Sequence, residues 1–295
     1  MGNNLPQAVI DNLNRKELEG RTTLRQLINT KQDMDSHFSN VATLYNNLRI
    51  TDLEPIEFIK DSLNGESVIQ AADIGCGAGR YCLKLLQHVD NLHLTCLDVN
   101  ESMLEQTSNC LKTAGITNFN TIRSSAENVP LGNNSMDYIF SFNAIHHFDF
   151  KKFMEMSANI IRNRGIIFIY TRLRSQNAKT IWGRYFPFFL EKEERLYELD
   201  ELEKMINPLE SLTIECAKPF KYRRKASLSQ LVNLARNSHY STFSLYQNNE
   251  FETALKGFKE NITRHFSTPE EIEWLDENTM LAVRKLERTP SDLPQ

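Results

Sequence analysis

The chain has 295 residues, of which 40% are hydrophobic and 24% are charged, and its formal net charge is -4. These values exclude a mainly disordered chain, because the apolar content is high and the net charge is small. They also exclude a membrane span, since the longest apolar stretches, such as 165–170, are far shorter than the roughly 20 residues that a bilayer requires. The length allows one large domain or two modest ones.

The N-terminus and the cysteines both indicate a cytoplasmic protein. The chain starts without a basic run followed by an apolar core, so we expect no secretory signal. Five cysteines without a C-x-x-C pair predict neither a disulfide framework nor a bound metal. The mild acidity, with an isoelectric point near 6.0, argues against a protein that binds nucleic acid through its overall charge.

The first half of the chain changes from helices to an alternation of strands and helices. Apolar residues at helical spacing predict helices in the first fifty residues and over 52–63. From residue 67 onward we expect strands at 68–74, 92–98, around 121–122, 136–142 and 165–171, with helices at 80–88, 102–114 and 150–162. Such alternation implies right-handed crossovers and a mainly parallel sheet. The predicted fold class is therefore α/β.

The second half interrupts this alternation. A segment rich in aromatic residues and arginine, 172–195, precedes a helix at 199–206, a sixth strand at 212–219, helices at 227–235 and 251–262, and a final strand at 279–284. We divide the chain into an N-terminal helical lid (1–50), a cofactor-binding core (51–171), a segment that includes the sixth strand (172–225), a helical cap insertion (226–266), and a final strand with a frayed tail (267–295).

Three alternating glycines join the first strand to its helix. Gly75, Gly77 and Gly79 let a ligand lie against bare backbone, with the helix N-terminus pointing at it. Their spacing differs from the G-x-G-x-x-G of dinucleotide sites, and Asp73 before them would repel a pyrophosphate but suit an amino group. The turn predicts a ligand that carries an ammonium and no phosphate; a tight turn without a ligand is the alternative.

The next two strand ends supply further polar groups. Asp98 closes the second strand, where an acid can accept hydrogen bonds from the hydroxyls of a ribose. The alternative is that Asp98 caps the helix that starts near Ser102, although Asn100 is available for that role. The third strand is followed by the turn 124–131, which is placed to meet an adenine edge. The three strand ends lie side by side, where open sheets bind ligands.

Together these motifs resemble those of class I S-adenosylmethionine (SAM)-dependent methyltransferases, over roughly 52–171 and the last strand. The similarity lies in the first motif at 73–79, the ribose-binding acid Asp98, the loop 126–131, the fourth strand at 136–140 and the stretch after it at 144–148. The resemblance implies a Rossmann-like, seven-stranded, mainly parallel sheet flanked by helices. It also implies SAM as the cofactor and S-adenosylhomocysteine as its product.

The resemblance further implies roles for individual residues in binding SAM. Asp73 would face the methionine ammonium, and Asp98 would bind the ribose hydroxyls. The other expected contacts are the backbone of Gly75, Cys76 and Gly77 along the methionyl and ribose portion, Val99 or Met103 on the adenine, Ser125 and Ala126 at its amino edge, and Phe142 or Asn143 beside the methionine carboxylate. Tyr45 and Arg49 resemble the Tyr and Arg that related enzymes bring over the cofactor; a packed Tyr and a solvated Arg are the alternative.

Two positions depart from the family's pattern. Ser125 stands where many members have Asp, so the hydrogen bond to the adenine amino group would be weaker. Asn163-Arg164-Gly165 replaces a Pro-Gly-Gly turn before the fifth strand, which affects local geometry and leaves the chemistry untouched.

Methyl transfer from a sulfonium requires mainly that the acceptor be held at near-attack distance in a dry pocket. A general base is needed only when the acceptor keeps its proton at neutral pH. His146 and His147 are the candidates for that catalytic role. The alternative is a structural role, because such histidine pairs occur in family members with different substrates.

Two basic segments, 171–189 and 218–225, are expected near the acceptor, together with the polar stretch 238–246. The residues predicted to bind the acceptor are Arg172, Arg174, Trp182, Arg184, Tyr185, His239 and Tyr240. One interpretation is an acceptor with a carboxylate or phosphate that the arginines clamp. The other is a solvated charged face. The helices between the last two strands, with the N-terminal helices, would form a cap that excludes water.

We therefore predict a SAM-dependent methyltransferase that acts on a small, anionic or aromatic metabolite and exists as a monomer or homodimer. One alternative is an enzyme that methylates tRNA or another RNA, because two basic segments beside a cofactor site could follow phosphates. Another is a SAM-binding partner subunit without catalysis. A dehydrogenase is disfavoured, since Asp73 and the glycine spacing both oppose a pyrophosphate.

Overall fold

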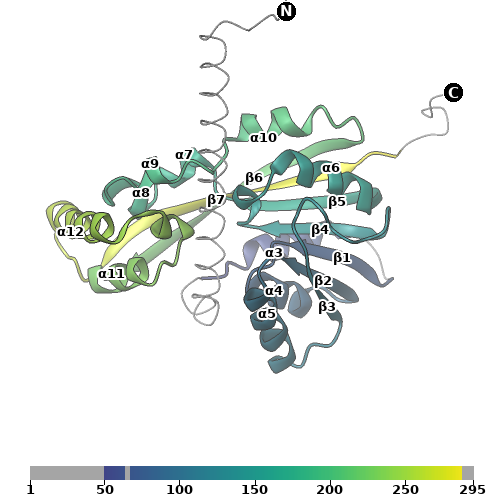
Figure 1. Cartoon of the computed structure of the whole chain (residues 1–295), viewed down its shortest axis with the longest axis horizontal. Coiled ribbons are helices and arrows are strands. Elements are labelled where there is room, and N and C mark those ends of the chain that lie inside the picture. Colours follow the sequence, from purple (N-terminus) through teal and green to yellow (C-terminus); the bar gives the residue numbers. More distant parts are fainter. Residues whose placement is uncertain (1–49, 64–66, 288–295) are drawn as a thin grey trace, which may run out of the picture.

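Seven strands form one sheet, in the order β3-β2-β1-β4-β5-β7-β6, in the computed structural model, which describes residues 50–63 and 67–287 (Figure 1). They are β1 (Ile69–Ile74), β2 (Leu92–Asp98), β3 (Phe119–Arg123), β4 (Met136–Phe142), β5 (Ile161–Thr171), β6 (Leu212–Ala226) and β7 (Ile272–Lys285). The first five are parallel, and β7 is antiparallel to β5 and β6. The predicted α/β class and mainly parallel sheet are confirmed.

Helices cover both faces of this sheet because its central strands are apolar on both sides. The helices α3 (Glu54–Ser62), α4 (Arg80–His88) and α5 (Glu101–Thr113) pack on one face, and α6 (Phe150–Ile160) and α10 (Leu199–Ile206) pack on the other. Successive residues of one strand serve the two layers: Ala71 belongs to the first core and Ala72 to the second. The strand order reverses between β1 and β4, which places a crevice at their carboxyl ends.

The last two strands are far longer than predicted. We expected them at 212–219 and 279–284, but their ladder runs from the pair Leu212 and Lys285 to the pair Ala226 and Ile272. The basic segment 218–225 therefore lies within β6. The strand could not be recognised from these charged residues, because one face of a two-stranded ribbon is exposed to solvent. Its pairing partner is also a distant segment of the chain.

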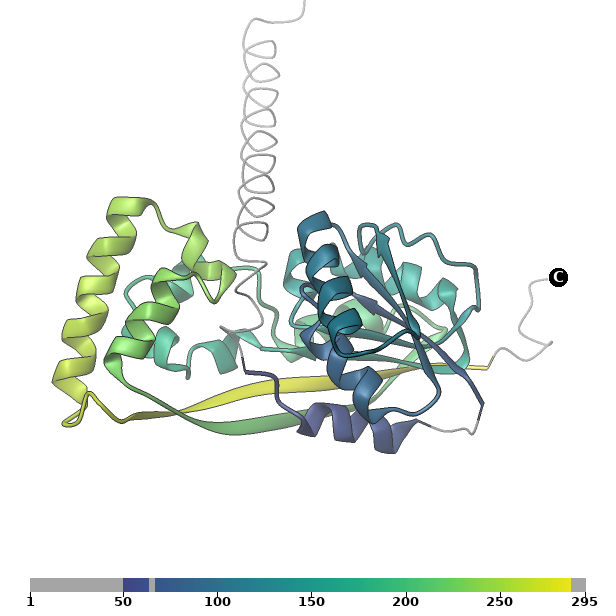
Figure 2. The ribbon, with the colours of Figure 1, turned by 90° about the horizontal axis from the view of Figure 1, so that it is seen from below.

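The β6–β7 ribbon extends beyond the sheet and carries a second layer of helices (Figure 2). These are α7 (Arg174–Asn177), α8 (Ile181–Tyr185), α9 (Phe189–Lys192), α11 (Leu228–Arg236), the short turn η2 (Ser241–Leu245) and α12 (Asn248–His265). We call residues 174–192 and 227–266 the cap. Both stretches share one aromatic core, in which the rings of Trp182 and Phe258 stack with centroids 5.1 Å apart. Residues 174–192 and 227–266, which are far apart in the sequence, thus pack together as one layer.

The helices predicted before residue 50 lie outside the described residues, as do Tyr45 and Arg49. Within the described part of the chain, no helix combines the length and apolar character needed to cross a membrane.

Candidate functional site

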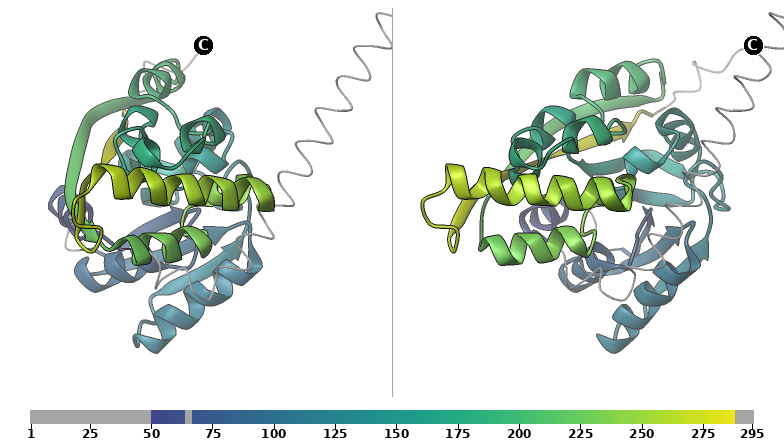
Figure 3. Two further views of the ribbon diagram at one scale, coloured as in Figure 1. Left: turned by 90° about the vertical axis from the view of Figure 1, so that its left-hand side faces the viewer. Right: turned by 60° about the vertical axis from the view of Figure 1, so that its left-hand side comes forward.

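A cavity of about 590 Å³ lies between the carboxyl ends of the parallel strands and the cap. Seen from the cap side, α12 and α11 stand in front of the sheet (Figure 3). The core side of the lining comes from the ends of β1, β2, β4 and β5, and the cap side from residues between Asn177 and Asn278. The cavity thus joins the predicted cofactor residues to the cap.

The three glycines of the turn adopt a left-handed backbone that other residues rarely reach. Gly75, Gly77 and Gly79 have φ values of 76°, 56° and 77°, in the left-handed region that favours glycine. A Cβ on Gly75 would lie 2.6 Å from Cζ of Phe148 and 2.7 Å from Cβ of Ala144. The amide of Gly75 donates to the carbonyl of Leu97 over 2.8 Å, which ties the turn to β2. The turn therefore offers a close backbone approach to anything in the cavity.

Asp73 lies beneath this turn with 1% of its surface exposed, and it lines the cavity. Its Oδ2 accepts a hydrogen bond from the Cys82 thiol over 3.1 Å, whereas its buried Oδ1 has no partner. Burial raises the pKa of Asp73 to about 8. An ammonium in the cavity would supply both the counter-charge and the missing donor, so this carboxyl fits the amino end of SAM.

Asp98 is held in place at the end of β2 by two backbone donors. Its Oδ2 accepts from the amide of Gly77 over 2.9 Å, and its Oδ1 accepts from the amide of Asn100 over 2.9 Å. The cap of α5 is Asn100, whose Oδ1 accepts from the amide of Met103 over 3.0 Å. The alternative role of Asp98 as a helix cap is thereby excluded, and its carboxylate faces the cavity.

The predicted adenine contacts also line the cavity. Val99 is 51% exposed, whereas Met103 and Ala126 are buried. Ser125 lies in a turn in which its carbonyl accepts from the amide of Asn128 over 3.2 Å. Three apolar residues and a serine from the ends of β2 and β3 therefore line the cavity.

The end of β4 supplies the middle of the cavity. Phe142 stacks on Tyr81 of α4, with ring centroids 4.2 Å apart. Asn143 has a φ of 52°, unusual for a residue with a side chain, and its amide donates to the carbonyl of Tyr170 over 2.7 Å. His146 and His147 follow on the short helix η1 (Ile145–His147), with ring centroids 4.1 Å apart. Both rings line the cavity.

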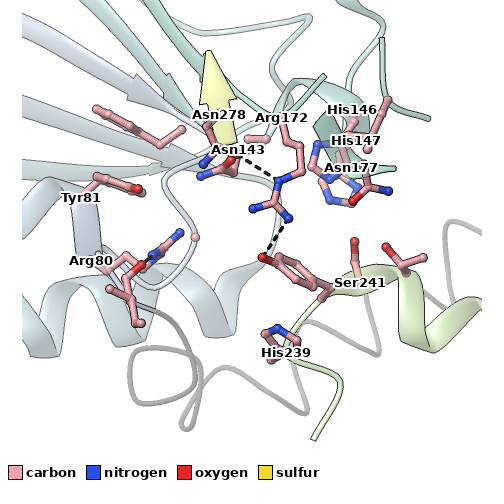
Figure 4. Close-up of a pocket in the computed structure, with 18 of the residues that line it drawn as sticks. Arg80, Tyr81, Asn143, His146, His147, Arg172, Asn177, His239, Ser241 and Asn278 are labelled. Atoms are coloured by element: carbon pink, nitrogen blue, oxygen red, sulfur yellow. Dashed lines mark hydrogen bonds between the residues drawn. The ribbon is translucent and has the colours of Figure 1, made fainter. Parts of the chain in front are cut away.

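Arg172, at the end of β5, lies in the middle of the cavity (Figure 4). Its Nε donates to Oδ1 of Asn278 over 3.1 Å, and one Nη donates to the Tyr240 hydroxyl over 3.0 Å. Its other Nη lies 3.4 Å from the Asp276 carboxylate. Figure 4 shows Asn143 and Asn278 on one side of Arg172, and the histidine pair on another.

A second arginine continues this network. Arg224 donates to both carboxylate oxygens of Asp52, over 2.7 and 2.8 Å, and its Nε lies 3.6 Å from Asp276. Burial raises the pKa of Asp52 although the hydrogen bonds from Arg224 oppose the shift. Two aspartates and two arginines thus form one charge-balanced chain along the cavity wall.

Glu193 forms a separate polar cluster on the cap side. It is 4% exposed, and it accepts two hydrogen bonds from the guanidinium of Arg195, over 2.8 and 2.6 Å. The Thr242 hydroxyl also donates to it, over 2.5 Å. The Arg195 nitrogen that forms the 2.6 Å hydrogen bond also donates to the Ser241 hydroxyl, over 3.2 Å. This glutamate is therefore neutralised and hydrogen-bonded without a ligand.

Three of the predicted acceptor residues lie outside the cavity lining. Arg174 turns away to the Leu196 carbonyl and pairs with Glu201 over 2.9 Å. Arg184 is exposed, because it occupies the outer side of a short helix whose inner side holds Trp182. Tyr185 packs on Phe266, with ring centroids 5.5 Å apart. The other four, Arg172, Trp182, His239 and Tyr240, do line the cavity.

Sequence reasoning missed several lining residues. Arg80 lines the cavity as the first residue of α4, where a cation opposes the helix dipole. This unfavourable placement of a cation indicates a nearby anion, such as a carboxylate, and could have been recognised from the sequence. Asp52 and Asp276 carried no such signal, and Arg224 was predicted only as part of the basic segment 218–225, because only the fold brings these three residues together.

The comparisons with known proteins agree with this geometry. Residues 71–165 match the sequence model of a methyltransferase domain. This stretch of the chain is thus similar to methyltransferase domains. The match ends before the cap begins, so the domain assignment concerns the cofactor half of the molecule. No curated protein matches this chain.

Several solved structures share the fold. A putative methyltransferase from an antibiotic biosynthesis pathway of Anabaena variabilis is 22% identical with a TM-score of 0.60, over 81% of this chain and 99% of that chain. A putative methyltransferase of Bacillus halodurans is 14% identical with a TM-score of 0.59, over 80% and 99%. Phosphoethanolamine N-methyltransferase 2 of Haemonchus contortus, with phosphomonomethylethanolamine and S-adenosylhomocysteine bound, is 14% identical with a TM-score of 0.53, over 86% and 58%. At these identities the likeness shows the fold alone, and the predicted resemblance to methyltransferases is supported by the match over residues 71–165.

Proposed function

We propose that this protein transfers a methyl group from SAM to a small acceptor bound between the methyltransferase domain and the cap. One observation carries the proposal: a single cavity of about 590 Å³ joins the glycine turn and Asp98 to an aromatic cap lining. This volume is in the range of about 300 to 1,000 Å³ typical of small-molecule sites. It supports a metabolite as the acceptor.

The residues of the core would hold SAM by its three chemical parts. The buried, unpartnered Oδ1 of Asp73 suits the ammonium, and the open backbone of Gly75 suits a closely approaching chain. Asp98 would bind the ribose hydroxyls, and Val99 with Met103 would contact the adenine, since all three line the cavity. Arg80 adds a cation suited to the methionine carboxylate. When bound, SAM supplies an electrophilic methyl group on its sulfonium.

The chain's own contribution to the reaction would be orientation, exclusion of water and proton transfer. The cap covers the carboxyl ends of the strands, which keeps the acceptor in a dry pocket. His146 or His147, which both line the cavity, would take a proton from an acceptor that is protonated at neutral pH. Asn143 and Arg172 border the same space and would orient the acceptor.

The RNA alternative finds less support in the cations that suggested it. Arg172 and Arg224 pair with Asp276, Arg174 pairs with Glu201, and Lys225 pairs with Glu271. These four cations are paired within the chain, which leaves fewer free positive groups for a track of phosphates.

The test is calorimetric titration with S-adenosylhomocysteine, in the wild type and in Asp98→Ala. We expect micromolar binding by the wild type and at least about tenfold weaker binding by the variant, because it loses a carboxylate hydrogen-bonded to ligand hydroxyls. Asp90→Ala, an exposed acid at the end of α4, is the matched control and should bind like the wild type. Equal affinity of Asp98→Ala and the wild type would contradict the assignment.

A second measurement separates the acceptor classes. The protein is incubated with methyl-labelled SAM and either a small-metabolite extract or total RNA from the source cells. We expect label in a small product. Label that enters only RNA would favour the RNA alternative, and binding of S-adenosylhomocysteine without any labelled product would favour a non-catalytic partner subunit.

A further inference from the structure

The acceptor side of the cavity is rich in charged side chains but carries no surplus of either sign among the described residues that form its buried wall. Arg172 and Arg224 face Asp52 and Asp276, which gives two charges of each sign. Glu193 and Arg195 cancel in the same way. The side chains of Arg172, Arg224, Asp52 and Asp276 are only 7 to 15% exposed, so water screens their charges little.

Such a wall disfavours the binding of an acceptor with either a negative or a positive charge. An acceptor carboxylate would lose its hydration and meet Arg172 only in competition with Asp276, which lies 3.4 Å from that guanidinium. An acceptor ammonium would lie beside Arg172 and would need a carboxylate that Arg224 or Arg195 already holds. Neither charge finds a counter-charge that is not already engaged.

The same wall suits a ring with a neutral polar group. Aromatic and aliphatic side chains line the cap side: Trp182, Phe189, Leu196, Leu234, Tyr240 and Trp274. Trp182 is fixed by its stack on Phe258 and by edge contacts to Phe243, so it presents a rigid surface. The Arg172 guanidinium spends three N–H directions on Asn278, Tyr240 and Asp276, and a guanidinium has five. It can therefore still donate to a neutral oxygen.

We infer that the acceptor is an uncharged aromatic compound with a hydroxyl or similar neutral polar group, which Arg172 orients by hydrogen bonding rather than by charge neutralisation. The inference rests on the proposed function, and it narrows the earlier expectation of an anionic or aromatic metabolite to the neutral aromatic class. Arg172 is the specificity-determining residue, and Asp276 is a positioning residue that keeps its charge balanced.

The test uses three phenols of similar size that differ in charge: 4-ethylphenol, 4-hydroxyphenylacetate and tyramine. Each is titrated into the protein saturated with S-adenosylhomocysteine. We expect 4-ethylphenol to bind at least about tenfold more tightly than either charged compound, since an uncompensated charge near like charges costs more than that factor. Equal or tighter binding of a charged member overturns the inference, and so does the absence of 4-ethylphenol binding.

Two variants should move the preference in opposite directions. Asp276→Asn removes a negative charge from the wall, so 4-hydroxyphenylacetate should gain about tenfold relative to 4-ethylphenol. Arg172→Gln removes a positive charge, so tyramine should gain instead. Asp200→Asn, an exposed acid of α10 that pairs with Lys204, is the control and should leave all three affinities unchanged. The two wall variants are independent, so the result stands if one of them fails to fold.

Failure of this inference and failure of the proposed function give different results. If the wild type does not bind S-adenosylhomocysteine, both the proposed function and this inference are wrong. Normal binding of S-adenosylhomocysteine, with a preference for a charged phenol that neither variant alters, would leave methyl transfer intact and overturn only the neutral acceptor.

Discussion

The two ends of the cavity are built in different ways. At the cofactor end, the site is made by backbone at the ends of two neighbouring strands: the turn from Gly75 to Gly79 and the two amides that hold Asp98. At the acceptor end, the site is made by side chains from distant segments, such as Arg224 and Asp52, which are 172 positions apart. The cofactor end thus depends on the backbone at neighbouring strand ends, whereas the acceptor end depends on ion pairs between distant segments.

This contrast predicts that the stability of the acceptor end depends on its ion-pair partners, and that the cofactor end depends on its backbone conformation. The largest effect is expected for Arg224→Met, which leaves the buried carboxylate of Asp52 without its counter-charge. The free energy of unfolding should fall by about 3 kcal/mol, as for other broken buried ion pairs. Urea denaturation measures it. Lys204→Met, which removes an exposed partner of Asp200, should leave the urea midpoint unchanged, and equal losses in the two variants would refute the distinction.

The next effect sharpens the argument about shape. Gly75→Ala should lower the free energy of unfolding by about 2–3 kcal/mol, because the φ of 76° and the overlap with Phe148 both oppose a Cβ. Gly115→Ala has a similar φ of 73° but no neighbour within 4 Å, so it should cost only about 1 kcal/mol. Thermal unfolding of the pair measures the difference. Gly75→Ala should also lose S-adenosylhomocysteine binding, and the inference of a close backbone approach fails if it binds normally.

The last effect concerns pH. Burial raises the pKa of Asp73 from its ordinary 3.8 to about 8, so the folded protein without cofactor holds this proton more tightly than the unfolded chain. Its contribution to stability is greatest below pH 4 and is lost as the pH rises toward 8. Asp73→Asn should therefore melt a few degrees higher than the wild type at pH 8, and the gap should shrink toward pH 5. Melting curves across this range measure it.

The same variant should lose affinity for S-adenosylhomocysteine, because the amide cannot balance an ammonium. A gain in stability with a loss of binding is the signature of a group kept for function. A variant that is less stable than the wild type at pH 8 would indicate a structural role for Asp73.

Much of the cofactor end followed from the sequence because each of its contacts is set within a few residues of a strand end. The glycine spacing, Asp73 and Asp98 were identified on that basis, and β2, β4, α4 and α10 were found at their predicted bounds. The reversal of strand order places these ends together without further information.

The acceptor end could not be predicted in the same way. The charged residues of β6 looked like a basic loop, because their strand partner lies in β7. Arg174 and Arg184 looked like acceptor ligands, but short helices turn one toward Glu201 and expose the other. The basic segments suggested either a clamp for an anion or a solvated face, and only the structure pairs Arg172 and Arg224 with distant aspartates and makes this wall neutral.

The sequence by itself determined the α/β fold and the chemistry of the cofactor end, because strand period, turn glycines and strand-end acids are local properties. The tertiary structure decided the length of the last two strands, the union of two segments into one cap, and the charge balance around the acceptor. Each of these depends on which distant side chains meet, and a charge has its effect only through the neighbours that the fold gives it.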